Sequence, residues 1–229
     1  WPGWALVGLA LAAGVGLWLV GAALEALMAL VFGYAPPATA DTYPVTIGQA
    51  VLVFAALAIS APLCEEIMFR GAIQCAYECR GRRQALIITS LMFAFFHFRL
   101  QGLVVLLPVA FTLGFLRLWS NSLWPAVAAH FSNNAMGAIL LAVAGLRTDW
   151  LANMPLGSPQ LAGVGLVVTL AALWLFARIA WRNKAGTAVP DIRQVTQFSW
   201  KAVLPLAIAA LLYMVVGGFE FVYGRMPER

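Results

Sequence analysis

A pair of adjacent glutamates is the first feature of this sequence that could perform chemistry. Glu65 and Glu66 lie in the stretch APLCEEIMFRG, and Arg70 follows four residues after Glu66. On a helix this spacing, with the acid first, favours an ion pair. Glu65 is turned by about 100° from Glu66 and lacks that partner. The spacing predicts that Glu66 neutralises Arg70 and leaves Glu65 free to act as a base; the alternative is one buried structural network of all three.

Two further stretches contain the two histidines of the chain. In FAFFHF, Phe93 and His97 share a helical face, and in NSLWPAVAAHFSNNAMG, His130 and Asn134 do the same. A lone histidine among phenylalanines is more often a packed core residue than a catalyst. Together, however, the three stretches supply a base, a second base or acid, and two potential oxyanion donors.

The elements that must hold these residues are membrane helices. The chain of 229 residues is 63% hydrophobic and 10% charged, far from the composition of soluble domains. Its long apolar runs suit helices that cross a bilayer, and the alternating pattern of a membrane barrel strand is absent. We therefore predict an all-α, polytopic membrane helix bundle of about seven transmembrane helices. The predicted spans are 4–33, 47–63 continuing as a more polar helix to 80, 85–98, 101–118, 122–146, 160–181 and 201–223.

The depth of the polar residues follows from the helical rise. At 1.5 Å per residue, Glu65 lies roughly 22 Å from Arg80 along its helix, and His97 roughly 21 Å from Arg83. A similar estimate places His130 inside the bilayer. Charged groups at such depth are costly and are functional by default, so we expect the three stretches to converge on one site.

The basic residues give orientation rather than nucleic-acid binding, although the net charge is +5. They lie between predicted spans and not along one polar face, and lipid is the expected surrounding. The three most basic connections fall on one side of a seven-span bundle, which is predicted to be cytoplasmic. These connections carry Arg80, Arg82 and Arg83; Arg117; and Arg178, Arg182, Lys184, Arg193 and Lys201.

Two other glutamates, Glu25 and Glu220, also fall inside predicted spans. We expect each to lie at the membrane interface or to pair with an outlying arginine; the alternative is that each lines the cavity, and neither is a predicted site residue. Residues 1–229 contain no repeat, low-complexity tract or soluble appendage, which predicts a single membrane-embedded domain with its three motif stretches at 61–137.

The three stretches together resemble the CPBP family, the CAAX-protease and bacteriocin-processing proteins, also called the Abi family, of intramembrane endopeptidases. That family carries EExxxR, FxxxH and HxxxN on successive membrane helices. The matching segments here are EEIMFR, FAFFH and HFSNN. Three motifs in order, each with its internal spacing, make a specific resemblance over about 61–137.

The resemblance implies a role for each matching residue. Glu65 and His97 would activate the attacking water, and His130 with Asn134 would stabilise the tetrahedral oxyanion. Glu66 and Arg70 would orient and neutralise. The expected activity is hydrolysis of a peptide bond in a membrane-associated protein or peptide, and the short loops favour a bacterial inner-membrane protein.

Three alternatives stay open from the sequence. Zinc would take Glu65, His97 and His130 as ligands, although the metal-free mechanism is favoured and no HExxH element is present. A non-catalytic immunity or binding protein on the same scaffold is the second alternative. An ion-coupled transporter is the third, and it predicts inverted repeats and broken helices that the sequence does not display.

Overall fold

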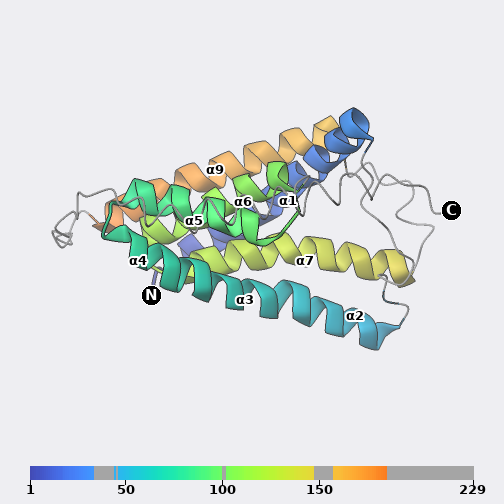
Figure 1. The fold of residues 1–229 in the computed structure, drawn as a ribbon, viewed down its shortest axis with the longest axis horizontal. Coiled ribbons are helices and arrows are strands. Elements are labelled where there is room, and N and C mark those ends of the chain that lie inside the picture. The colour runs from blue at the N-terminus through green and yellow to red at the C-terminus, as the bar shows by residue number, and fades with distance from the viewer. Residues whose placement is uncertain (34–43, 45, 100–101, 147–156, 185–229) are drawn as a thin grey trace.

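The computed structural model describes residues 1–33, 44, 46–99, 102–146 and 157–184. Every regular element within these ranges is helical, which confirms the all-α prediction. The long helices run side by side along the length of the molecule (Figure 1). They are α1 (Trp4–Phe32), α5 (Arg82–Phe96), α6 (Leu103–Ser120), α7 (Trp124–Leu146) and α9 (Pro159–Lys184).

The glutamate pair lies on a composite helix over residues 47–78. The helix begins with a capping box, in which Thr46 and Gln49 each bond the other's backbone N–H through their side chains. Two π-helical turns then flank the segment that carries the glutamates, an arrangement often found at functional sites. The successive parts are α2 (Ile47–Phe54), η2 (Ala55–Ser60), α3 (Ala61–Glu66), η3 (Ile67–Ile73) and α4 (Gln74–Glu78).

Five helices of the described chain are long and apolar enough to cross a membrane. They are Trp4–Phe32, Ile47–Glu78, Leu103–Ser120, Trp124–Leu146 and Pro159–Asn183. The predicted span 85–98 corresponds to α5, whose 15 residues extend only about 22 Å. The predicted span 201–223 lies outside the described residues. A multi-pass membrane protein is therefore supported, and the count of seven stays a prediction.

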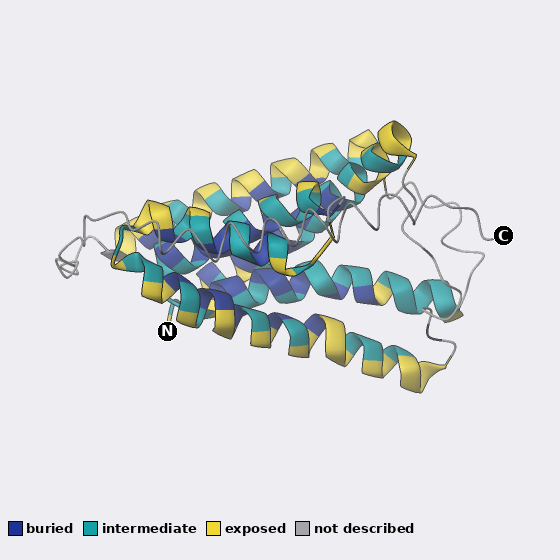
Figure 2. Ribbon diagram, viewed as in Figure 1, coloured by how far each residue is buried: buried dark blue, intermediate teal, exposed yellow. Residues whose placement is uncertain are grey.

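Close helix packing in the bundle uses small residues. Helix α1 packs against both α9 and α7, and its buried face includes Ala10, Ala13 and Gly14. Such residues let membrane helices approach closely. Large apolar side chains such as Leu52, Val167 and Trp181 are exposed. Figure 2 shows buried residues between the helices and exposed ones on the outer faces of α2 and α9, as lipid-facing surfaces require.

Candidate active site

The Glu66–Arg70 ion pair predicted from the sequence is present and completely buried. Arg70 Nη1 lies 3.1 Å from Glu66 Oε1, and both side chains have zero exposure. Arg70 Nη2 also donates to the Ala110 carbonyl oxygen of α6, at 2.9 Å. The guanidinium lies 4.3 Å from the centre of the Phe93 ring, a cation–π distance. Arg70 thus connects the glutamate pair to both α5 and α6.

Gln74 extends this polar stripe by one more step along the same helix. Its side chain is fully buried, and Nε2 donates to the Gly114 carbonyl oxygen of α6 at 3.1 Å. A Cβ at Gly114 would lie 3.3 Å from Gln74 Oε1 and 2.5 Å from Leu86 Cδ1, so any larger residue at this position would make the Leu86 side chain shift. The sequence analysis did not identify Gln74. The available signal was its position four residues after Arg70 on the face of Glu66.

His130 is held by Glu66, a contact that the sequence did not predict. Its Nδ1 lies 2.8 Å from Glu66 Oε1 and the ring is almost completely buried. An ionised carboxylate only accepts hydrogen bonds, so the proton of this bond belongs to Nδ1. The other nitrogen, Nε2, lies 3.9 Å from Glu65 Oε2. Glu66 therefore fixes which edge of His130 faces Glu65.

His97 approaches Glu65 from the end of α5. Its Nδ1 lies 2.8 Å from the Phe93 carbonyl oxygen, and since a carbonyl only accepts, Nδ1 is the donor. The Nε2 atom is 3.8 Å from Glu65 Oε2. The Phe93 ring contacts both imidazoles, at centroid distances of 4.8 Å to His97 and 5.6 Å to His130. One aromatic ring of the FxxxH motif thus packs against both histidines and Arg70.

Glu65 lies between the two histidines. Its Oε2 atom is 3.8 Å from His97 Nε2 and 3.9 Å from His130 Nε2, both beyond direct hydrogen-bond range. Separations of this size suit groups bridged by a small polar molecule. Glu65 is one-fifth exposed, at 22%, whereas Glu66 is at 0%. The adjacent carboxylates therefore differ in environment: part of the Glu65 side chain is exposed, although its Oε2 atom is buried and has no hydrogen-bond partner among the described residues.

Asn134 lies one helical turn beyond His130 and bonds to the backbone of η2. The Ala61 N–H donates to the Ala56 carbonyl oxygen, five residues earlier, so the Leu57 carbonyl would next receive a bond from residue 62. Residue 62 is proline, which has no N–H. The Leu57 oxygen instead accepts from Asn134 Nδ2 at 3.0 Å. Pro62 thus creates the acceptor that Asn134 binds, and Asn134 keeps one further N–H.

Glu25 and Glu220 are the two glutamates predicted to lie inside membrane spans but outside the site. Glu25 pairs with Arg99 at 3.9 Å between Oε1 and Nη2, which confirms the expected pairing with an outlying arginine. Glu25 also lines a cavity, which was the alternative for this residue. Glu220 lies outside the described residues. Glu65, Glu66, Arg70, His97 and His130 form one connected cluster, and Asn134 lies beside it.

Comparison with known proteins is consistent with this geometry. Residues 46–136 match the family model of type II CAAX prenyl endopeptidase Rce1-like proteins. The match confirms the family resemblance. It covers less than half of the chain but includes all six predicted site residues. No curated protein and no solved structure matches the chain. The family points to a CAAX-type intramembrane endopeptidase, with peptide substrates reached within a membrane.

The carboxylates and imidazoles of the cluster are the side chains that could hold a metal ion. Among the described residues, no group of three or more histidine, cysteine, aspartate or glutamate side chains is arranged to hold one. His130 Nδ1 is engaged by Glu66, which leaves only Nε2 for any other contact. Glu65, His97 and His130, the alternative zinc ligands, are not grouped as metal ligands in the described part of the chain, and the metal-free mechanism stays a prediction.

Proposed function

We propose that the chain is an intramembrane endopeptidase that hydrolyses a peptide bond in a membrane-associated protein or peptide, with Glu65 as the base. The single observation that supports Glu65 is its position between two imidazole Nε2 atoms, at 3.8 and 3.9 Å. A water beside Glu65 Oε2 would contact the carboxylate and one histidine at once. The surrounding bundle and the family match agree with an action inside the bilayer.

In the proposed reaction, Glu65 takes one proton from water while the water oxygen attacks the peptide carbonyl carbon. The C–N bond then breaks, and the proton passes to the leaving nitrogen. His97 orients the water through Nε2, since its Nδ1 proton is held by the Phe93 carbonyl. Glu66 and Arg70 act by position and charge, holding the ring of His130.

The oxyanion role of His130 has a chemical requirement. Because Nδ1 donates to Glu66, a neutral ring presents a lone pair at Nε2 and cannot donate there. His130 therefore stabilises an oxyanion only when both nitrogens carry protons. Asn134 would contribute its second N–H while the first stays on Leu57. Donors of this kind typically contribute about 3 kcal/mol each to the transition state.

The test compares membranes from cells that make the wild-type chain, Glu65→Gln or Glu78→Gln. Glu78→Gln is the matched control, because it makes the same chemical change on the same composite helix outside the cluster. New peptide termini measured by mass spectrometry should appear with the wild type and the control and disappear with Glu65→Gln. Identical termini in all three membranes, at equal protein levels, would contradict the proposal and favour a binding or immunity role.

We also propose that catalysis needs no metal. The purified wild-type chain should keep its peptidase activity in 1,10-phenanthroline, and its zinc content by mass spectrometry should be far below one ion per chain. Loss of activity in the chelator, with recovery on adding zinc, would instead assign Glu65, His97 and His130 as ligands in an arrangement that differs from the one described.

A further inference from the structure

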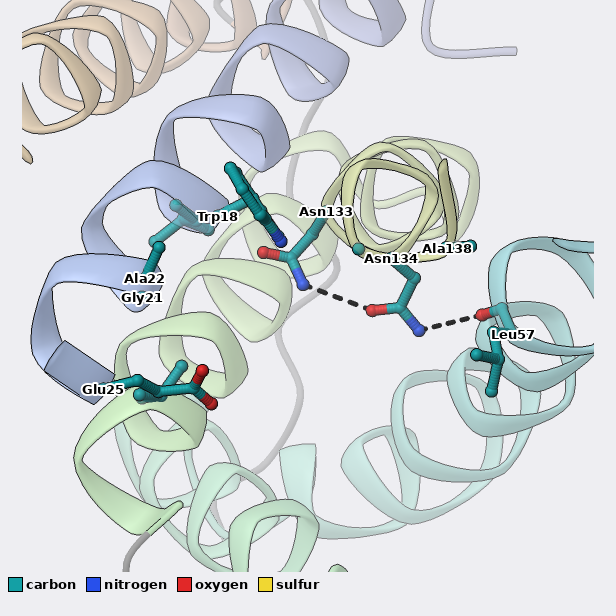
Figure 3. A pocket seen from close by; sticks show the side chains of 11 residues that line it. Trp18, Gly21, Ala22, Glu25, Leu57, Asn133, Asn134 and Ala138 are labelled. Atoms are coloured by element: carbon teal, nitrogen blue, oxygen red, sulfur yellow. Dashed lines mark hydrogen bonds between the residues drawn. The ribbon is translucent and has the colours of Figure 1, made fainter. Parts of the chain in front are cut away.

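A cavity of about 300 Å³ lies beside the catalytic cluster, between α1, η2, α6 and α7. It adjoins the cluster through Asn134, which lines the cavity and lies one turn from His130 on α7. Figure 3 shows its walls, with Glu25 and Trp18 entering from α1 and the two asparagines from α7. A volume of this size is at the lower end for ligand sites, and it suits a long side chain rather than a whole helix.

The lining is apolar along its length and polar at a few positions. Leu17, Leu57 and Val105 give apolar walls, whereas Asn133 and Glu25 give polar groups. The Asn133 amide donates through Nδ2 to Asn134 Oδ1 at 3.2 Å. Both amides are neutral groups, and this hydrogen bond orients them toward each other. Glu25 is the charged member of the lining.

The charge of Glu25 is only weakly compensated. Its partner Arg99 is 3.9 Å away, and the two side chains are 51% and 46% exposed. Exposed pairs of this kind contribute little and exchange readily. Arg99 also follows two residues after His97 in the sequence, so the Glu25 end of the cavity lies near the end of α5 that carries the site. A cationic group of a ligand can therefore replace Arg99 beside Glu25 at only a small cost in free energy.

We propose that this cavity is a substrate subsite that takes a lysine or arginine side chain near the scissile bond. The apolar walls match the aliphatic part of such a side chain, and Glu25 matches its charged end. An acidic side chain or a lipid phosphate would instead meet the negative charge of Glu25. The inference rests on the proposed function, because it names the kind of peptide that the endopeptidase recognises.

The test measures binding without turnover, in a chain that carries Glu65→Gln. The probes are three apolar peptides, identical except for one residue, each with a benzophenone photolabel beside it. That residue is lysine, norleucine, which has the same aliphatic length without charge, or glutamate. Labelling of the lysine peptide should exceed that of the norleucine peptide by about two- to fivefold, as expected for a partly exposed ion pair. The labelled residues should lie on α1 and α7.

Substitutions at Glu25 then decide the assignment. Adding Glu25→Gln should remove the lysine preference, and adding Glu25→Lys should shift it to the glutamate peptide. Adding Glu78→Gln instead should leave it unchanged. Equal labelling by the lysine and norleucine peptides, or a lysine preference that survives Glu25→Gln, would overturn the subsite. Each chain must elute as a single species with an unchanged unfolding temperature before the comparison.

A separate cleavage measurement distinguishes failure of the subsite from failure of the proposed endopeptidase function. The same peptides without the photolabel are incubated with the chain that retains Glu65, and cleavage is followed by mass spectrometry. Absence of cleavage together with an intact lysine preference would overturn the endopeptidase and keep the subsite. Cleavage with no difference between lysine and norleucine would keep the endopeptidase and overturn the subsite.

Discussion

At the scale of single residues, the site is organised by one shared carboxylate oxygen. Glu66 Oε1 accepts from Arg70 at 3.1 Å and from His130 at 2.8 Å, and none of these side chains has more than slight exposure. A buried pair stabilises a fold less than its contacts imply, because both charges lose their solvation. Its observed partners instead indicate an orienting function, since they determine the direction of the His130 ring.

Replacing only one member of the Glu66–Arg70 pair should reduce stability far more than replacing both. Glu66→Gln leaves Arg70 buried without its counter-ion, which should cost about 3–5 kcal/mol of stability. The double variant Glu66→Gln with Arg70→Met should recover much of that loss, because no unpaired charge remains. Peptidase activity should stay low in both variants, since His130 loses its ionised partner.

Thermal unfolding in detergent and peptide cleavage, measured in parallel, separate the two effects. Arg70→Met alone completes the comparison, and losses of stability in the two single variants that simply add in the double variant would show that Glu66 and Arg70 are not coupled. Recovery of activity along with stability would show that the pair matters for folding alone, and the orienting role would then be wrong.

At the scale of elements, helix packing determines how close α7 comes to its neighbours. Gly14 of α1 lies against α7, and a Cβ added there would overlap the Ala129 carbonyl oxygen and Ser132 Oγ. Backbone atoms cannot move aside as a flexible side chain does. Because α7 carries His130 one residue after Ala129, the register of this contact affects the site directly.

We predict that Gly14→Ala destabilises the chain by about 1–3 kcal/mol, the usual cost of overpacking, and lowers activity by displacing His130. Gly8→Ala is the matched control on the same helix, because a Cβ at Gly8 meets nothing within 4 Å. Alanine at that position should be neutral or slightly stabilising. Unfolding temperatures of the two variants test the difference, and equal values would contradict the packing described for α1 and α7.

The sequence predicted contacts within one helix better than contacts between helices. The Glu66–Arg70 pair and the shared face of Phe93 and His97 follow from helical spacing alone. The bond from His130 to Glu66 spans 64 positions and depends on how α7 packs, which no local pattern specifies. The bond from Asn134 to Leu57 could be expected only after the π-helical turn before Pro62 was known.

At the scale of the whole molecule, the helices place the basic turn and the cavity in different halves of the bundle. The basic turn between α4 and α5 consists of Arg80 together with Arg82 and Arg83, the first two residues of α5. Arg82 Nη2 donates to the Leu118 carbonyl oxygen near the end of α6. The cavity instead lies nearer the beginning of α6, at Val105, and the later part of α1. An excess of arginine marks the cytoplasmic side of a membrane protein, and we therefore predict that the cavity lies in the outer half of the bilayer.

Cysteine labelling tests this orientation because the described chain has exposed thiols at one end of the bundle. Cys79 is exposed beside the basic turn. In a chain with Cys64→Ala and Cys75→Ala, Cys79 should react with a membrane-impermeant maleimide only in inside-out vesicles. Ser158 lies just before α9. In a chain without the three native cysteines, Ser158→Cys should react only from the outer face of intact cells.

The reverse labelling pattern would invert the bundle, so that the basic turn faces outward and substrates enter the Glu25 cavity from the cytoplasmic half. Labelling of both positions from the same side would contradict the placement of Cys79 and Ser158 at opposite ends of the bundle.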